Sequence, residues 1–144
     1  VREIVSLKLS DMGIVGEVGS NDLILIVEML IHNNNPLNTF PPLKNIYESY
    51  AMKQDAPDIK KEMKAIEQRL RRTILLSMQH LATIGAIDYT SPEFEHYAPR
   101  YFDFQEIRKL TIEIGENRTI PSKIKVNIKK FLQVLYLEVL ESYK

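Results

Sequence analysis

One long amphipathic segment, residues 58–81 (DIKKEMKAIEQRLRRTILLSMQHL), constrains the fold of this chain more than any other feature. Its apolar residues recur at alternating steps of three and four, which places them on one face of a helix. These residues are Ile59, Met63, Ile66, Leu70, Ile74 and Leu81. The opposite face is polar as far as Arg72 and apolar beyond it. A helix that is charged along its first half and buried along its second is typical of the recognition helix of a helix-turn-helix protein.

The remaining segments predict an all-α domain of about six helices that spans residues 1–144. Glycines, prolines and asparagines mark the expected breaks between the helices. We expect an N-terminal helix over 1–12, a core helix over 20–32 capped by Ser20, a helix-turn-helix over 43–82, and C-terminal helices over 103–143. Within the last range, Asp103 and Glu106 predict a capping box, and Pro121 with Ser122 predicts the start of the final helix. The stretch between 86 and 104 shows no helical period.

Charge is balanced over the whole chain, with 19 basic and 19 acidic residues, but it is unevenly distributed. Residues 58–72 hold six basic and three acidic side chains, and residues 119–137 hold four lysines and no acid. The intervening range 85–117 is acidic, with seven acids against three bases. Two basic segments around an acidic one predict local fields of opposite sign, although either basic segment is equally compatible with a simply solvated helix face.

Several classes of protein are disfavoured by the residues that are missing. The chain has no cysteine, which excludes a disulfide framework and fits a reducing cytoplasm. No apolar run is long enough to span a bilayer. The glycines at 13, 16 and 19 lack the Lys-Ser/Thr of a phosphate-binding loop, and His32, His80 and His96 are far apart in the sequence. We therefore expect a cytoplasmic protein that is not an enzyme, has no cofactor or metal, and does not bind a membrane.

Two blocks and the recognition helix resemble one family. Three parts of the chain are similar to the YcbB family, the output domain of GlnL-type response regulators. They are the block GIVGEVGSND (13–22), the block FEHYAPRYFDF (94–104), and the residues Ile66, Glu67, Leu70 and Arg71 of the expected recognition helix. A more distant resemblance is to the effector domain of the Bacillus sporulation response regulator. The aromatic residues of the second block are interpreted as core or interface packing rather than as a base-stacking platform, because only Arg100 is interleaved with them.

The resemblance implies double-stranded DNA as the partner and places Arg71 and Gln68 at DNA-contacting positions, whereas the phosphate contacts are expected from the charges on the helix. Arg71 takes the position of a family arginine that reaches DNA, with Glu67 orienting it, and Gln68 takes a position that is basic in the sporulation regulator. Phosphate contacts are expected from Lys60, Lys61, Lys64, Arg69 and Arg72. The lysines of the C-terminal segment either hold a flanking stretch of the DNA backbone or are only solvated. These lysines are Lys123, Lys125, Lys129 and Lys130.

The resemblance also implies a larger assembly. Because the chain opens on Val1 inside a predicted helix, we expect it to be a fragment of a longer protein. A phosphorylatable receiver domain is expected upstream, served by a cognate sensor kinase, and the domain is expected to bind DNA as a homodimer. The regulated genes would concern glutamine uptake or use. The alternative is a helical protein–protein interaction module with a basic face.

Overall fold

The structure is a computed structural model that describes residues 1–33, 40–117 and 123–142. Seven helices and no strand occur within these ranges, which confirms the predicted all-α class. The helices are α1 (Arg2–Asp11), α2 (Val18–His32), α3 (Leu43–Lys53), α4 (Ile59–Ile87), α5 (Pro92–Tyr101), α6 (Phe104–Gly115) and α7 (Ile128–Glu141). Within the described part of the chain, none of them is both long and apolar enough to cross a membrane.

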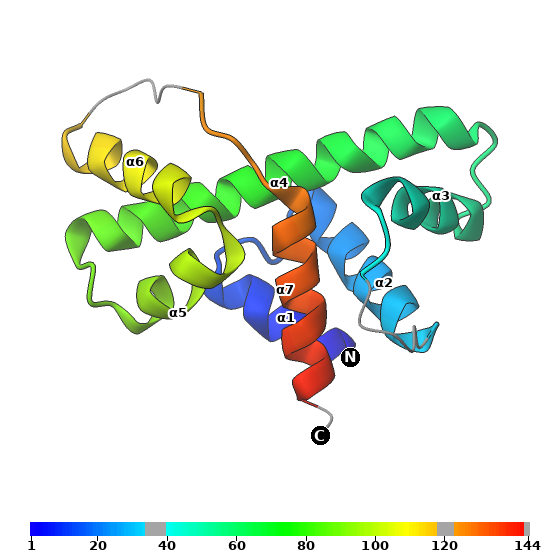
Figure 1. The fold of residues 1–144 in the computed structure, drawn as a ribbon, viewed down its shortest axis with the longest axis horizontal. Coiled ribbons are helices and arrows are strands. Elements are labelled where there is room, and N and C mark those ends of the chain that lie inside the picture. Colours follow the sequence, from blue (N-terminus) through cyan, green and yellow to red (C-terminus); the bar gives the residue numbers. More distant parts are fainter. Residues whose placement is uncertain (34–39, 118–122, 143–144) are drawn as a thin grey trace.

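The longest helix, α4, organises the whole molecule (Figure 1). Its 29 residues correspond to a length of about 43 Å at 1.5 Å per residue. It contacts α3 along its first half and α5 and α6 along its second half, while α2 and α7 pack against its middle. Asp58 caps its N-terminus, since the side chain accepts a hydrogen bond from the backbone N–H of Lys61 at 3.2 Å. The connector from Gln54 to Asp58 is short, which is compatible with a helix-turn-helix formed by α3 and α4.

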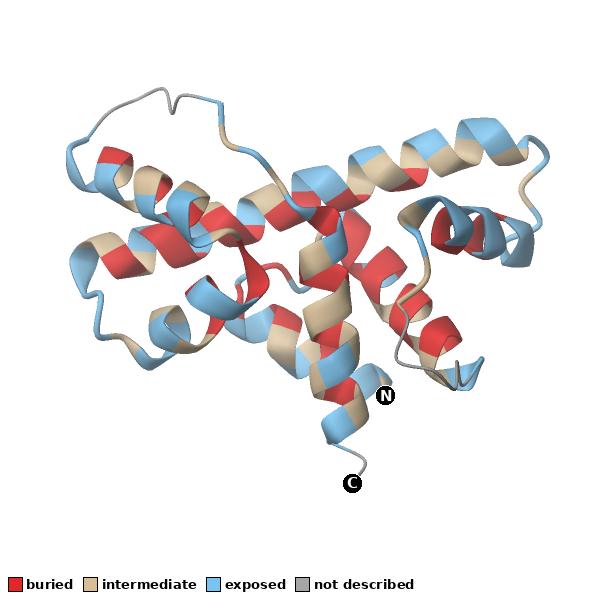
Figure 2. Ribbon diagram, in the orientation of Figure 1, coloured by how far each residue is buried: buried red, intermediate tan, exposed pale blue. Residues whose placement is uncertain are grey.

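The apolar stripes of the helices meet in one core (Figure 2). From α4, Ile66, Leu70, Ile74 and Leu81 are completely buried, as the predicted helical face requires. The stripe of the last helix belongs to this core and not to an exposed interface. Its members Phe131, Leu135 and Val139 have no exposed surface. Full burial of each such side chain contributes roughly 1.5–3 kcal/mol, so the two stripes together fix where α4 and α7 lie.

The prediction that Ser20 caps the core helix was wrong. The helix α2 begins two residues earlier, at Val18. The Ser20 hydroxyl is buried and donates to the carbonyl oxygen of Ile14 instead of capping its own helix. Gly19 occupies the first turn, and its backbone N–H donates to the Thr73 hydroxyl oxygen of α4 at 3.0 Å. The glycine-rich block therefore forms a packing contact with α4.

The stretch predicted to lack helical structure contains α5. Pro92 lies in its first turn, where a backbone N–H would have no partner within the helix. The helix continues to Tyr101 even though Pro99 lies inside it. Tyr97, Tyr101 and the following Phe102 are buried, and the ring of Tyr101 contacts Phe131 of α7 at a centroid distance of 5.1 Å. Packing in the core therefore stabilises a short helix with weak sequence signals. The interpretation of these three aromatic residues as packing residues agrees with their burial.

The final helix begins later than its predicted start. Pro121 and Ser122 lie outside the described residues, while residues 123–127 are not helical and α7 begins at Ile128. Asn127 caps it by accepting a hydrogen bond from the backbone N–H of Lys130 at 3.0 Å. Helix α6 does start after Asp103, but neither the Asp103 nor the Glu106 side chain forms the predicted capping box. Both carboxylates accept hydrogen bonds from the segment that leads into α7.

Candidate nucleic-acid interface

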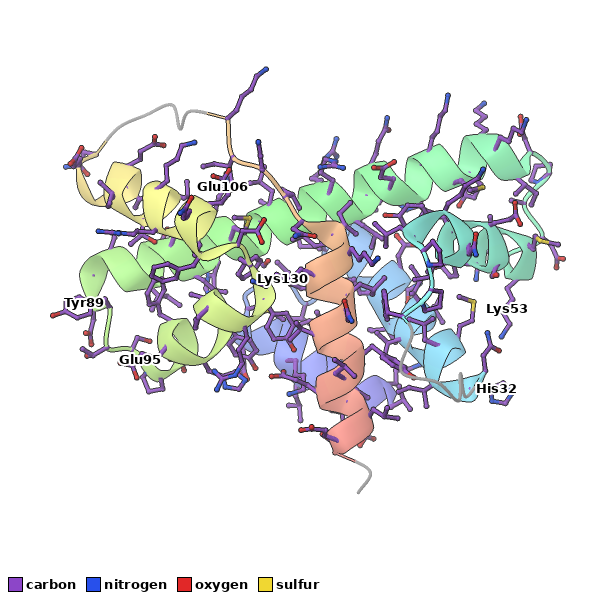
Figure 3. All side chains as sticks on the ribbon, in the orientation of Figure 1. His32, Lys53, Tyr89, Glu95, Glu106 and Lys130 are labelled. Carbon is purple, nitrogen blue, oxygen red and sulfur yellow. The ribbon has the colours of Figure 1, made fainter. Side chains whose placement is uncertain are left out.

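The first half of α4 exposes a continuous polar face. We call this surface the basic face of α4, and it consists of Lys60, Lys61, Lys64, Gln68, Arg71 and Arg72, all of them exposed. The face exists because buried Ile66 and Leu70 hold the other side of the helix against the core. Lysine and arginine side chains extend from α4 into solvent along this half of the helix (Figure 3). The residues of the predicted recognition surface are therefore brought together on one element.

The acids of this region are paired within the protein, which leaves the basic face with an excess of positive charge. Glu67 bonds to Arg71 one turn away, with 3.0 Å between Oε1 and Nη2, as predicted for a residue that orients the arginine. Glu62 pairs with Arg69. Within the described part of the chain, the other four cations of the region have no ion-pair partner. These four are Lys60, Lys61, Lys64 and Arg72.

Arg69 differs from its neighbours because it faces the interior of the helix pair. Its Nε and Nη2 atoms donate to the carboxylate of Asp22 at 2.8 and 3.2 Å, and Nη2 also donates to Glu62 at 3.1 Å. Tyr50 of α3 donates its hydroxyl proton to the same Asp22 carboxylate at 2.8 Å. These contacts raise the pKa of the Arg69 guanidinium. The placement of Arg69 argues against the phosphate contact predicted for it, because its charge is neutralised inside the protein.

The Asp22 cluster joins three helices. Asp22 lies in α2, Tyr50 in α3, and Arg69 with Glu62 in α4, so one carboxylate fixes α4 relative to both α2 and α3. Burial raises the pKa of Tyr50, and its hydrogen bond to Asp22 adds to the rise. Sequence analysis identified neither Asp22 nor Tyr50 as important. The available signal was a single acid directly before the apolar run 23–27 of a predicted core helix, since a buried carboxylate needs a partner.

Two of the C-terminal lysines lie beside the basic face. A shallow groove of about 330 Å³ is lined by Glu67 and Arg71 of α4 on one side and by Lys125 and Lys129 on the other. Lys130, in contrast, turns inward, and its Nζ atom donates to the carbonyl oxygen of Phe102 at 2.7 Å. The structure thus divides the predicted C-terminal lysines. Lys125 and Lys129 lie near Arg71, whereas the ammonium group of Lys130 is held by a backbone carbonyl.

A second groove, of about 560 Å³, lies between α3 and α4. Its apolar lining comes from Leu43, Tyr47 and Met63. The charged residues that also line it are Lys44, Lys60, Lys64, Glu48 and Glu67. The hydroxyl of Tyr47 is buried and has no hydrogen-bond partner among the described residues. Burial raises the pKa of Tyr47 to about 12. No group of three or more acidic or histidine side chains in the described ranges is arranged to hold a metal ion.

The chain belongs to the YcbB domain family, whose model matches residues 5–135. This match runs from within α1 to the middle of α7 and confirms the predicted family resemblance. More particularly, the chain is similar to the transcriptional regulatory protein GlnL of Bacillus subtilis (strain 168), with 32% identity over 147 residues. The matched region is 96% of this chain and 47% of GlnL, so the chain spans about half the length of that relative. No solved structure matches the chain.

Proposed function

We propose that this chain is the sequence-specific DNA-binding output domain of a two-component response regulator that controls transcription. The observation that carries the proposal is the basic face of α4, which is exposed and positively charged on a helix pair with helix-turn-helix layout. Membership of the YcbB family and similarity to a transcriptional regulatory protein support the same conclusion.

In the proposed complex, the first half of α4 lies in the major groove. Arg71 and Gln68 are nearest the base edges, where arginine pairs bidentately with guanine and glutamine with adenine. Lys60, Lys61, Lys64 and Arg72 neutralise phosphates and supply the part of the affinity that depends on salt. Glu67 holds the Arg71 guanidinium through one nitrogen, which limits its rotamers before DNA binds and leaves its other donors available.

The wider assembly is part of the same proposal. A single helix in the groove reads only a few base pairs, so useful specificity requires two copies on paired half-sites, and we expect a homodimer on DNA. A phosphorylatable receiver domain upstream, with its cognate sensor kinase, would control this pairing in the cytoplasm. Genes for glutamine uptake or use are the expected targets, in keeping with the resemblance to GlnL-type regulators.

The test begins with a binding selection from random duplexes, which yields a preferred sequence. Affinities of the wild type and variants are then measured for that duplex and for a scrambled one over a range of salt concentrations. Arg71→Ala should abolish the preference between the two duplexes. Lys61→Ala should weaken binding to both duplexes and lower the salt slope by about 1, because it removes one phosphate contact.

Lys53→Ala is the matched control, because this exposed lysine lies at the end of α3, away from Glu106 and Lys130 (Figure 3). It should change neither property. If the wild type selects no sequence and neither Arg71→Ala nor Lys61→Ala alters retention on DNA at low salt, the DNA-binding proposal is wrong.

A second candidate function is a protein–protein interaction module. The groove between α3 and α4 favours it, because its lining combines apolar Leu43, Tyr47 and Met63 with three lysines against two glutamates, which suits an amphipathic helix with acidic residues. Failure of DNA binding, together with retained binding to a negatively charged amphipathic peptide that Met63→Ala weakens, would favour this candidate over the first.

A further inference from the structure

Residues 123–127 form an irregular segment that is anchored to α6 and its N-cap residue Asp103 before α7 begins. The backbone N–H of Lys125 donates to Glu106 Oε1 at 2.7 Å, and the carbonyl oxygen of Lys123 accepts from Lys109 Nζ at 3.3 Å. Asn127 donates its amide to Asp103 at 3.3 Å. Glu106 of α6 lies next to the segment that leads into α7 (Figure 3). These contacts use backbone atoms and the Asn127 amide, and therefore leave the lysine side chains of the segment unengaged.

The lysines of this region fall into two groups. Lys109 and Lys130 bond to backbone carbonyls, and both also approach a carboxylate within 4.0 Å. Lys123, Lys125 and Lys129 are exposed and have no ion-pair partner within the described ranges. We call these three lysines the basic arm. Asp103, Glu106 and Lys109 thus hold the segment in place, while the three lysines of the basic arm remain exposed to solvent.

The basic arm continues the charged surface of α4. Lys125 and Lys129 line the same groove as Arg71, together with the acids Glu67 and Asp103, so two of the three lysines of the arm lie beside the arginine that is expected to read bases. A long, flexible ammonium side chain is a point charge without the fixed geometry that base discrimination needs, and it suits phosphate neutralisation. A ligand that lies along the basic face and covers Arg71 would therefore also pass these lysines. If the ligand carries closely spaced negative charges, the lysines would neutralise some of them.

We propose that the basic arm binds the phosphodiester backbone of the same DNA duplex that α4 reads. The inference rests on the proposed function and extends it by a second contact surface from a different part of the chain. The arm supplies affinity without sequence preference, and its anchors on α6 hold it at a fixed place relative to Arg71. A duplex carries one negative charge per about 1.7 Å of its axis, so a duplex that passes the arm can offer a phosphate to each of its lysines.

The experiment compares the salt dependence of binding for three arm variants and one control on the selected duplex. Each lost phosphate contact lowers the slope of log affinity against log salt by about 0.9. Lys125→Gln should therefore lower the slope by about 0.9, and the double variant with Lys129→Gln by about 1.8. The double variant should bind about 60-fold more weakly than the wild type at 0.1 M salt, relative to their affinities at 1 M. Lys125→Arg should retain the wild-type slope, and Lys53→Gln is the control for general loss of charge.

The outcomes separate the two proposals. A lower slope with an unchanged ratio between selected and scrambled duplexes supports the arm. If Arg71→Ala loses the preference while the double variant keeps the wild-type slope, the arm inference is wrong and the proposed function stands. An equal loss for Lys53→Gln would also refute the arm. Absence of wild-type binding to any duplex would overturn the proposed function itself. Far-UV circular dichroism, expected to be unchanged, verifies that the exposed substitutions leave the fold intact.

Discussion

Removal of the Asp22 carboxylate should destabilise the protein more than any loss of a surface charge. Asp22→Ala leaves the Tyr50 hydroxyl without its acceptor and the Arg69 guanidinium with Glu62 alone. The Asp22 side chain is 8% exposed and that of Arg69 is 29% exposed, so both partners of the broken pair are largely withdrawn from water. Breaking such a pair leaves a poorly solvated charge behind, which is the dominant cost.

The expected magnitude follows from these contacts. Removing one partner of a buried ion pair costs about 3–5 kcal/mol. Arg69 retains Glu62 and some contact with water, which lowers the expected loss for Asp22→Ala to about 2–3 kcal/mol. For a domain of this size, 1 kcal/mol corresponds to about 4 °C in Tm, so Tm should fall by about 10 °C.

Urea unfolding at pH 7, followed by circular dichroism, measures the free energy of unfolding directly, and a thermal scan measures Tm. Glu28→Ala is the matched control because it breaks an exposed pair with Arg2, whose side chain is 61% exposed, and should cost less than about 1 kcal/mol. If the two variants differ by less than about 0.5 kcal/mol, the Asp22 cluster does not hold the helices together as argued. A double-mutant cycle with Arg69→Met would then show no coupling.

Two further substitutions test the packing around α4. Tyr47→Phe should stabilise the protein by about 1 kcal/mol at pH 7, because it removes a buried hydroxyl without a partner among the described residues. Burial raises the pKa of Tyr47 to about 12, so between pH 10 and 12 the tyrosine ionises in the unfolded state before it ionises in the folded state. The wild type therefore loses stability as pH rises through this range. The stability advantage of Tyr47→Phe, measured by urea unfolding, should grow accordingly. Gly19→Ala should destabilise by about 1–3 kcal/mol, because a Cβ atom there would lie 2.6 Å from the carbonyl oxygen of Arg69. The control Gly115→Ala meets no atom closer than 3.8 Å, and an equal loss of Tm for both variants would contradict the predicted clash at Gly19.

The architecture could be predicted where local signals are strong. The apolar period of α4 is long enough to identify a helix and its buried face, and Asp58 marks its start. The sequence also predicts correctly that α6 starts after Asp103, but it does not predict what the Asp103 side chain binds. A capping box requires only local contacts, whereas Asp103 and Glu106 bond to residues 123–127, and no local pattern reports so distant a partner.

The error at α5 has a different cause. This ten-residue helix contains two prolines and is too short for a clear period, so its own sequence favours a loop. Burial of Tyr97 and Tyr101 against the core supplies the missing stability. The tertiary contacts that stabilise this segment as a helix come from α4 and from α7, and α7 lies some thirty residues further along the chain, beyond the reach of local sequence patterns.

The position of Arg69 shows how far a helical pattern can define a binding surface. Residues seven apart share one face of a helix, so Glu62 and Arg69 were recognisable as neighbours from the sequence alone. The decisive partner, Asp22, is 47 residues away and becomes visible only in three dimensions. Periodicity can thus place a charge on a helix face, but it cannot tell whether that face meets solvent or a buried carboxylate.

Local pairing also explains how a chain without net charge can present a basic surface. Of the acids in the first half of α4, Glu62 is bound by Arg69 and Glu67 by Arg71, so neither of them neutralises the lysines of the basic face. At an ionic strength of 0.15 M, charges more than about 8 Å apart are largely screened from one another. An approaching polyanion therefore responds to the unpaired lysines within that distance and not to the balanced total. The salt slope of binding should accordingly count the free cations of α4 and the basic arm.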